Sequence, residues 1–307
     1  MPVLLFLLLC FCNQLCAQDF ERGFITNSTI GNPMSLEVNQ YYLPAYRYIN
    51  VYSRPDVQSK VFTKTQSFAD SLKVVEVLTG KYSKFKNVYG QWCKVTFPLK
   101  GKRFFGYVPS QFLAPLQIKQ GTKTYLVFIE KYQKGTFIFS LKVLNKFNLI
   151  SEHTFKAPAN EHYSPVETDT IGKALSGYLE LSLFNNKGLD SVEHVIKVSG
   201  GIDACGYWNG TKILLLRDNR VIKELEEGSV GDADIYHEGY SYLFPADSLG
   251  EKNMFIKDMW YSEAVDDTFT NTWDARVKYK WFNNHLIKID SVYSSKRINT
   301  YLERNAE

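Results

Sequence analysis

Four side chains of the types that bind metal ions lie close together near residue 235. They are Asp232, Asp234, His237 and Glu238. In an extended strand, alternate residues share a face and residues three apart do not, so these side chains converge only if the chain bends. We therefore expect a solvated loop or strand edge here rather than a metal site. A hydrolase or metal-dependent enzyme with its site in this half of the chain is the alternative.

The other residue types that serve in catalysis are scattered along the sequence. The five histidines show neither His-x-x-Glu-His nor His-x-x-x-His spacing, and no Gly-x-Ser-x-Gly elbow or glycine-rich phosphate loop is present. Cys93 alternates with Val95 and Phe97 on one face of a predicted strand, which is typical of a small core residue. Cys205 has no histidine nearby. We expect no catalytic residue, no cofactor and no enzymatic activity.

Aromatic and basic side chains are concentrated before residue 116. Residues 40–115 carry 12 Lys and Arg against 3 Asp and Glu, a net charge of +9, whereas the whole chain has +4. Aromatic rings beside cations suit peptides, glycans or acidic polymers. The alternative is that half of the rings are core and the lysines form a solvated rim. The candidate ligand-binding residues are Tyr48, Tyr52, Tyr89, Trp92, Tyr107, Lys84, Lys86, Lys102 and Arg103.

Short strands must position these side chains. Apolar residues favour strands around Val51 and over residues 72–78, 91–97 and 103–108, with a basic loop at 81–90. Residues 109–113 are expected to form one tight helical turn followed by a short strand. Five short strands in this length predict a small closed barrel, because an open sheet would leave its edges unpaired.

Residues 41–115 resemble a bacterial SH3 domain. The resemblance rests on Ile49-Asn50-Val51 with Ser53 and Pro55, the apolar strand at 72–78, Trp92 with Lys94-Val95, and Gly106-Tyr107-Val108 with Phe112-Leu113. It implies an SH3-like barrel that binds cell-wall peptide or another envelope component. The sequence departs from the family at Arg54, where glycine is usual, and in the long stretch 81–90.

A larger β-rich half is expected to follow. Residues 116–123 read as a linker, 124–290 as a β-rich domain, and 291–307 as a polar tail. Apolar runs on either side of Gln133-Lys134-Gly135 predict a hairpin, and residues 217–220 and 282–285 predict tight turns between adjacent strands. This rhythm favours a β-sandwich or a propeller-like β-meander, so the whole chain is predicted to be all-β.

One loop of this half resembles the calcium loop of degenerate integrin-like (FG-GAP) propeller repeats. Residues 185–190 place Asn and Asp around Gly188, but Leu183 and Lys187 stand where the motif has acids. Calcium needs several carboxylate oxygens, and a lysine ammonium would repel the ion. We expect a loop that only turns the chain.

The first residues are typical of an export signal. Residues 3–12 are uninterruptedly apolar, about half the length that spans a bilayer, and a small residue, Ala17, suits cleavage. No Lys or Arg precedes the run, and a buried N-terminal strand or a mis-set start codon is the alternative. We expect a signal peptide at 1–17, a flexible lead-in at 18–40, and a periplasmic or secreted protein that does not span the membrane.

Together these patterns predict an exported, non-catalytic binding protein. Its expected partner is an envelope polymer, peptide or protein, and not nucleic acid. The positive charge of the chain would also suit nucleic acid, but an exported protein rarely meets nucleic acid. The remaining alternative is a structural subunit of the envelope whose exposed strand edges recruit another protein.

Overall fold

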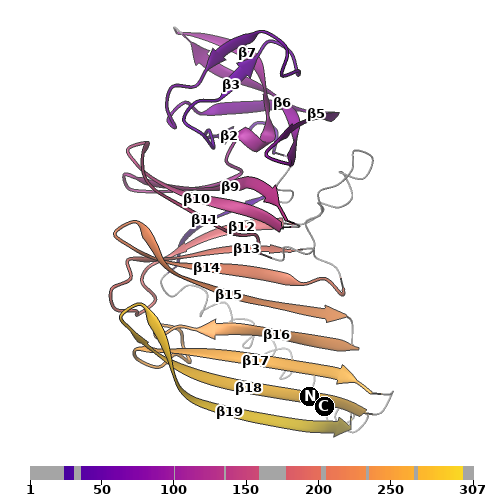
Figure 1. The fold of residues 1–307 in the computed structure, drawn as a ribbon, viewed down its shortest axis with the longest axis vertical. Coiled ribbons are helices and arrows are strands. Elements are labelled where there is room, and N and C mark those ends of the chain that lie inside the picture. Colours follow the sequence, from indigo (N-terminus) through magenta and orange to yellow (C-terminus); the bar gives the residue numbers. More distant parts are fainter. Residues whose placement is uncertain are drawn as a thin grey trace, which may run out of the picture. The chain divides into compact units, whose positions relative to one another are not determined.

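The fold is known from a computed structural model. It describes residues 24–30, 36–99, 101–134, 136–158, 178–201, 205–232, 235–265 and 269–299. These form strands β1 to β19 and one short 3-10 helix, η1 (Ser110–Phe112), so the predicted all-β class is confirmed (Figure 1). The helix occupies the position of the predicted helical turn. The predicted signal peptide at 1–17 lies outside the described residues.

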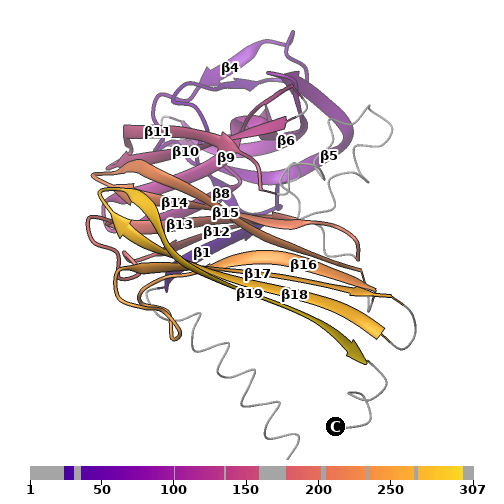
Figure 2. The same cartoon turned by 60° about the horizontal axis from the view of Figure 1, so that its bottom comes forward.

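The first of three sheets, called here the N-terminal sheet, has six strands in the order β2-β5-β6-β7-β3-β4 and curls upon itself (Figure 2). Val51, Val95 and Val108 are fully buried in it, as expected for a common interior. Val75 is only half-buried, because a register shift after Val74 turns it away. The strands are β2 (Tyr41–Tyr42), β3 (Asn50–Tyr52), β4 (Val61–Lys64), β5 (Leu72–Phe85), β6 (Val88–Leu99) and β7 (Lys102–Pro109).

A glycine brings two of these strands into close contact. A Cβ atom on Gly106 of β7 would lie 2.4 Å from Cγ1 of Val51 on β3, which is closer than two carbon atoms can approach. Only glycine therefore lets β7 cross β3 at this point without displacing the core valine.

The stretch 81–90 was predicted to be a basic loop, and this prediction is wrong. The residues are the outer arms of a hairpin between β5 and β6. Lys86 and Asn87 form its two-residue turn, with φ of 49° and 61°. Two successive positive φ angles are typical of the type I′ turns that match the strand twist. The predicted turns at 217–220 and 282–285 are confirmed by the same signature, at Asp218-Asn219 and Asn283-Asn284.

The second sheet has the order β11-β10-β9-β8. The predicted linker at 116–123 is mostly strand β8, whose residues all pair with β9. The predicted hairpin at 125–141 is confirmed as the β9–β10 pair. The strands are β8 (Leu116–Gln120), β9 (Lys123–Gln133), β10 (Thr136–Asn145) and β11 (Asn148–Lys156).

The third sheet has nine strands in the order β1-β12-β13-β14-β15-β16-β17-β18-β19, so β12 to β19 form a continuous meander. The predicted lead-in at 18–40 contributes β1, and β19 continues into the predicted polar tail. The strands are β1 (Phe24–Ile30), β12 (Tyr178–Phe184), β13 (His194–Gly201), β14 (Asn209–Arg217), β15 (Arg220–Asp232), β16 (Tyr236–Leu243), β17 (Met254–Ala264), β18 (Phe269–Phe282) and β19 (His285–Asn299).

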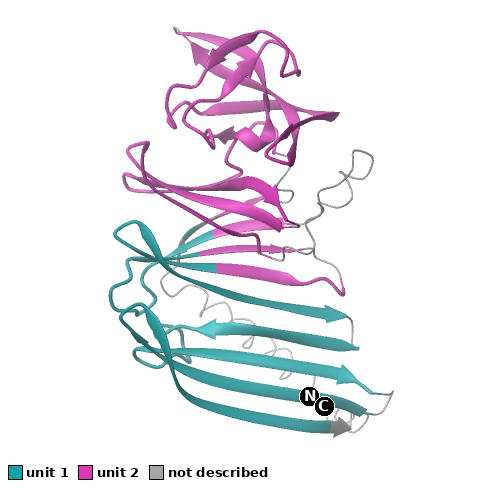
Figure 3. Ribbon diagram, in the orientation of Figure 1, with its two compact units in different colours: residues 1–26, 182–196, 213–307 teal, residues 27–181, 197–212 magenta. Residues whose placement is uncertain are grey.

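The chain divides into two compact units (Figure 3). Unit 2 comprises residues 27–181 and 197–212, and unit 1 comprises residues 1–26, 182–196 and 213–307. The N-terminal sheet and the β8–β11 sheet therefore belong to one unit, which the sequence had divided at 116–123. The hydrophobic core of unit 1 is built around Phe244, Phe255 and Trp281. The ring centroid of Phe255 lies 4.9 Å from that of Phe244 and 5.7 Å from that of Trp281.

The two sheets of unit 2 meet around a buried lysine. Lys142 of β10 donates a hydrogen bond from Nζ to the carbonyl oxygen of Ala45, at 2.8 Å. Its ammonium lies 4.7 Å from the ring centroid of Tyr46, 4.9 Å from that of Phe128 and 5.7 Å from that of Phe68. Burial lowers the pKa of Lys142, and the nearby carboxylates of Glu152 and Glu130 oppose that shift.

Tyr46 extends this contact. Its hydroxyl donates a hydrogen bond to Glu130 Oε2 at 2.9 Å, and the Lys86 ammonium pairs with the other oxygen of Glu130. Burial, followed by the negative charge of Glu130, raises the pKa of Tyr46. The hydroxyl thus stays protonated at pH values where an exposed tyrosine ionises.

Replacing Lys142 by alanine should destabilise unit 2. The variant leaves the Ala45 carbonyl without its donor and opens a cavity between three aromatic rings. We expect a loss of about 3 kcal/mol in the free energy of unfolding, measured by urea denaturation. Lys119→Ala is the control, because Lys119 is exposed on β8 of the same unit and should change stability by less than about 0.5 kcal/mol. Equal effects would contradict the role given to Lys142.

The raised pKa of Tyr46 predicts a loss of stability in alkali. Above pH about 10 the unfolded chain releases this proton while the folded chain retains it, so stability falls as pH rises. Wild type should therefore lose about 1.4 kcal/mol more than Tyr46→Phe between pH 9 and pH 11. Parallel urea-denaturation curves for the two proteins over this range would refute the assignment.

Candidate functional site

The structure distributes the nine candidate ligand-binding residues over separate places. Tyr52 and Trp92 are 8% and 2% exposed and pack edge to face with ring centroids 5.5 Å apart, so both belong to the core. Tyr107 is half-buried opposite Lys94, and Tyr48 is exposed beneath the guanidinium of Arg47. The nine side chains therefore do not converge on one groove.

Three of the candidates lie at the β5–β6 turn. The Lys84 ammonium sits 5.2 Å from the ring centroid of Tyr89, which is its register partner. Lys86 pairs with Glu130 and lies 5.1 Å from the ring of Tyr46. This lysine is therefore engaged within the fold and is not free for a ligand.

The last two candidates pair with residues that line a pocket. Lys102 and Arg103 begin β7, directly opposite Leu99 and Pro98 at the end of β6. Leu99 and Pro98 line a pocket of about 440 Å³ in the N-terminal sheet, which lies within the usual size range of small-molecule sites. Its lining residues are Val51, Thr63, Lys64, Thr65, Gln66, Ala69, Asp70, Ser71, Leu72, Phe97, Pro98 and Leu99.

The pocket has an apolar floor and a polar wall. Val51, Leu72 and Phe97, all buried, form the floor. Lys64 contributes a cation from the end of β4. The one carboxylate among the lining residues, Asp70, accepts hydrogen bonds from the backbone N–H groups of Gln66 and Ser67 at 2.6 and 3.1 Å. Asp70 is thus held by the backbone of its own turn, and Lys64 is the one cation among the lining residues.

Lys64, Lys102 and Arg103, called here the basic rim, are not neutralised within the sheet. Among the described residues, Lys86 is the one Lys or Arg of residues 40–115 that has a carboxylate within ion-pair distance. Lys64 lines the pocket, Lys102 and Arg103 pair with its lining residues Leu99 and Pro98, and all three side chains are exposed to solvent. An anionic group would gain Coulomb energy there, and the gain would weaken with added salt.

Exposed aromatic surface adjoins the same pocket. Phe62 of β4 is 41% exposed, and its ring lies 6.1 Å from Phe97 and 5.5 Å from Phe104. Lys64, Phe62 and the polar wall were not predicted, because no strand was assigned between residues 56 and 71. The available signal was the β-branched and aromatic composition of Val61-Phe62-Thr63.

The four possible metal ligands near residue 235, which we expected to lie in a solvated loop or strand edge, do not form a cluster in the described part of the chain. Asp232 ends β15, His237 and Glu238 lie on β16, and Asp234 falls outside the described residues. No three His, Cys, Asp or Glu side chains within the described ranges could hold a metal ion together. His237 lies against Gly231, where an added Cβ would approach its Nδ1 atom to 2.5 Å.

The loop at 185–190 carries its own cation. The Lys187 ammonium pairs with Asp247 Oδ1 and lies over the rings of Phe184 and Phe244, at 5.1 and 5.5 Å from their centroids. The loop therefore presents a lysine ammonium, already paired with a carboxylate, where a calcium-binding loop would present an acidic side chain. This agrees with a loop that only turns the chain.

Cys93 and Cys205 are both free thiols. Cys93 is fully buried on β6 beside Val95, and burial raises its pKa to about 12. A thiol with such a pKa holds almost no thiolate at neutral pH and is a poor nucleophile.

Comparison with known proteins returns no relative. No protein-family model, no curated protein and no solved structure matches the chain. Within the described residues, none of the helices has the length and apolar character to cross a membrane.

The two cysteines should differ sharply in reactivity. With a chain beginning at Gln18, iodoacetamide at pH 8 should modify the exposed Cys205 and leave the buried Cys93 unmodified. Peptide mass spectrometry would give the extent of each reaction, and modification in denaturant provides the control for Cys93. Rapid alkylation of Cys93 in the folded protein would contradict its placement in the core.

Proposed function

We propose that the protein is an exported, non-catalytic binding protein whose N-terminal sheet binds an acidic component of the cell envelope. The pocket of about 440 Å³ with its rim of Lys64, Lys102 and Arg103 supports this proposal most directly. Its apolar floor would take an uncharged part of the ligand, and its rim would take carboxylate or phosphate groups.

The charge distribution along the chain supports the same function. The net charge of +9 over residues 40–115 contrasts with a net charge of −5 for all other residues together, since the chain as a whole has +4. Acidic partners would therefore be drawn to the N-terminal sheet. The resemblance to a bacterial SH3 domain points to peptide or cell-wall recognition by this part of the chain.

Export is the second part of the proposal. It rests on the apolar run at 3–12 and the small residue at Ala17, which suit a cleaved signal peptide. In this setting the ligands that the cationic rim would meet are acidic polymers and peptides of the envelope.

Binding of a defined polyanion tests the proposal. Poly-L-glutamate should bind the chain beginning at Gln18, and its dissociation constant, measured by isothermal titration calorimetry, should rise between 50 and 200 mM salt because screening weakens the attraction. The triple variant K64E/K102E/R103E should bind about 10- to 100-fold more weakly.

The control removes the same charge from unit 1. K280E/K288E/K296E changes three exposed lysines on β18 and β19 and should keep binding within about threefold of wild type. Binding that is equally weak in both triple variants would show only an effect of net charge. Binding that the first variant leaves unchanged would overturn the assignment of the pocket.

A further inference from the structure

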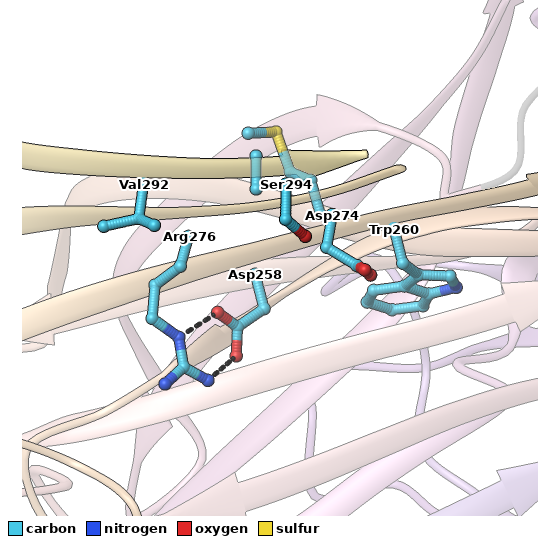
Figure 4. Close-up of a pocket in the computed structure, with 8 residues that line it drawn as sticks. Asp258, Trp260, Asp274, Arg276, Val292 and Ser294 are labelled. Atoms are coloured by element: carbon cyan, nitrogen blue, oxygen red, sulfur yellow. Dashed lines mark hydrogen bonds and ion pairs between the residues drawn. The ribbon is translucent and has the colours of Figure 1, made fainter. Parts of the chain in front are cut away.

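A second depression lies on the outer strands of unit 1 (Figure 4). It has a volume of about 360 Å³ and is formed by β17, β18 and β19. Its lining residues are Asp258, Met259, Trp260, Asp274, Ala275, Arg276, Val292 and Ser294. None of them was predicted from the sequence to belong to a binding site.

Strand register gathers the polar residues of this depression on one face. Trp260, Asp274 and Ser294 are successive partners across the three strands, and Asp258, Arg276 and Val292 form the next row. Partners in antiparallel strands point to the same side of a sheet. An indole ring, carboxylates and a hydroxyl therefore surround one patch of surface, as Figure 4 shows.

The indole of Trp260 lies over its neighbouring strand. Its register partner on β16 is Gly239, and a Cβ atom added there would lie 2.6 Å from Cζ2 of the ring. The absent side chain makes room for the ring, which is 36% exposed. Part of the ring is thus packed against Gly239, while the ring still presents surface to solvent.

The charged groups around the ring differ in their freedom. Arg276 donates two hydrogen bonds to Asp258, from Nε to Oδ1 at 2.7 Å and from Nη2 to Oδ2 at 2.8 Å. These bonds raise the pKa of Arg276 and fix the guanidinium along the strands. Asp274 has no hydrogen-bond or ion-pair partner among the described residues. Its carboxylate is available as a hydrogen-bond acceptor.

We propose that this depression is a binding subsite for a neutral glycan. The face of an aromatic ring carries partial negative charge, and the C–H groups on the flat side of a pyranose ring carry partial positive charge, so a sugar can stack on Trp260. An ionised carboxylate accepts hydrogen bonds and donates none, so Asp274 suits sugar hydroxyls, which can donate to both of its oxygens. Ser294 and the Arg276–Asp258 pair add further polar groups beside the ring.

Charge and size narrow the class of glycan. Because Asp258 is compensated by Arg276, the charge that directly neighbours Trp260 in register is the carboxylate of Asp274, and the nearest other cation on the same face, Lys296, lies one row further on. A uronate or a phosphorylated sugar stacked on Trp260 would be repelled by that carboxylate. The volume of about 360 Å³ lies at the small end of ligand sites and suits one or two sugar rings. This ligand is chemically opposite to the acidic partner proposed for the N-terminal sheet, so the subsite is an additional binding function.

The chain offers a matched control for Trp260. Trp273 on the adjacent strand is also 36% exposed, but its register partner is Tyr261, so it lies on the opposite face of the sheet. Trp273→Ala removes the same ring from the same pair of strands without touching the depression. Asp274→Asn keeps the size of the side chain and replaces one acceptor oxygen by a donor group.

Titration calorimetry of the chain beginning at Gln18 tests the proposal with three neutral probes, the tetrasaccharides of glucose (cellotetraose and maltotetraose) and of N-acetylglucosamine, and one anionic probe, tetragalacturonate. At least one neutral probe should bind. Trp260→Ala should weaken that binding about tenfold or more, and Asp274→Asn by about three- to tenfold, whereas Trp273→Ala should change it less than about twofold.

Each other outcome overturns the subsite. Absence of binding to all three neutral probes, equal losses in the two tryptophan variants, or tighter binding of tetragalacturonate would contradict it. Circular dichroism and thermal unfolding of each variant verify that it remains folded. The triple variant K64E/K102E/R103E should bind the neutral probe as wild type does, so this result stands or fails independently of the acidic partner.

Discussion

The arrangement of unit 2 depends on a lysine buried between its two sheets. Lys142 reaches from β10 to the Ala45 carbonyl and is surrounded by the rings of Tyr46, Phe68 and Phe128. Burying an ammonium is costly, and the cost is offset here by a hydrogen bond, ring faces and the carboxylate of Glu152 at 3.6 Å. Such an interaction has strict geometric requirements, so it favours one way of packing the two sheets.

The contact between the two sheets of unit 2 neutralises one positive charge of the N-terminal sheet and leaves others exposed. Lys86 forms an ion pair with Glu130 of β9, and the Tyr46 hydroxyl donates a hydrogen bond to the same carboxylate. Lys64 lines the pocket instead, and Lys102 and Arg103 pair with residues that line it. None of these three cations has a carboxylate partner among the described residues. A strongly basic sequence thus contains both structural cations and cations available to a ligand, and only the fold separates them. The depression on β17–β19 relies on a different balance, with a paired arginine and one free carboxylate.

Local sequence signals predicted much of the fold. Val51, Val95 and Val108 alternate with polar residues and are buried, and the turns at Asp218-Asn219 and Asn283-Asn284 have the residues that positive φ angles favour. The hairpin at 81–90 was missed, because its turn is Lys86-Asn87 and its arms are basic and half-exposed. Strands β1, β8 and the end of β19 were missed for a related reason, since their pairing depends on backbone hydrogen bonds with distant or neighbouring strands.

The candidate site could be predicted only in part. Lys102 and Arg103 were identified from their charge and pair with residues that line the pocket without lining it themselves, whereas Tyr52 and Trp92 were identified from their rings and are core residues. Composition shows which side chains could bind, but burial and register decide which are free to do so. Trp260 and Asp274, fourteen positions apart in the sequence, become neighbours only through the β17–β18 register.

Amide hydrogen exchange of the chain beginning at Gln18, measured by mass spectrometry with and without poly-L-glutamate, tests the central claim most directly. That claim is that the pocket between β4 and the end of β6 is the surface that takes the acidic partner. The account predicts slower exchange in residues 61–72 and 97–104, with no change in β17–β19. Protection confined to the hairpin at 81–90, or spread evenly over the basic residues, would contradict it.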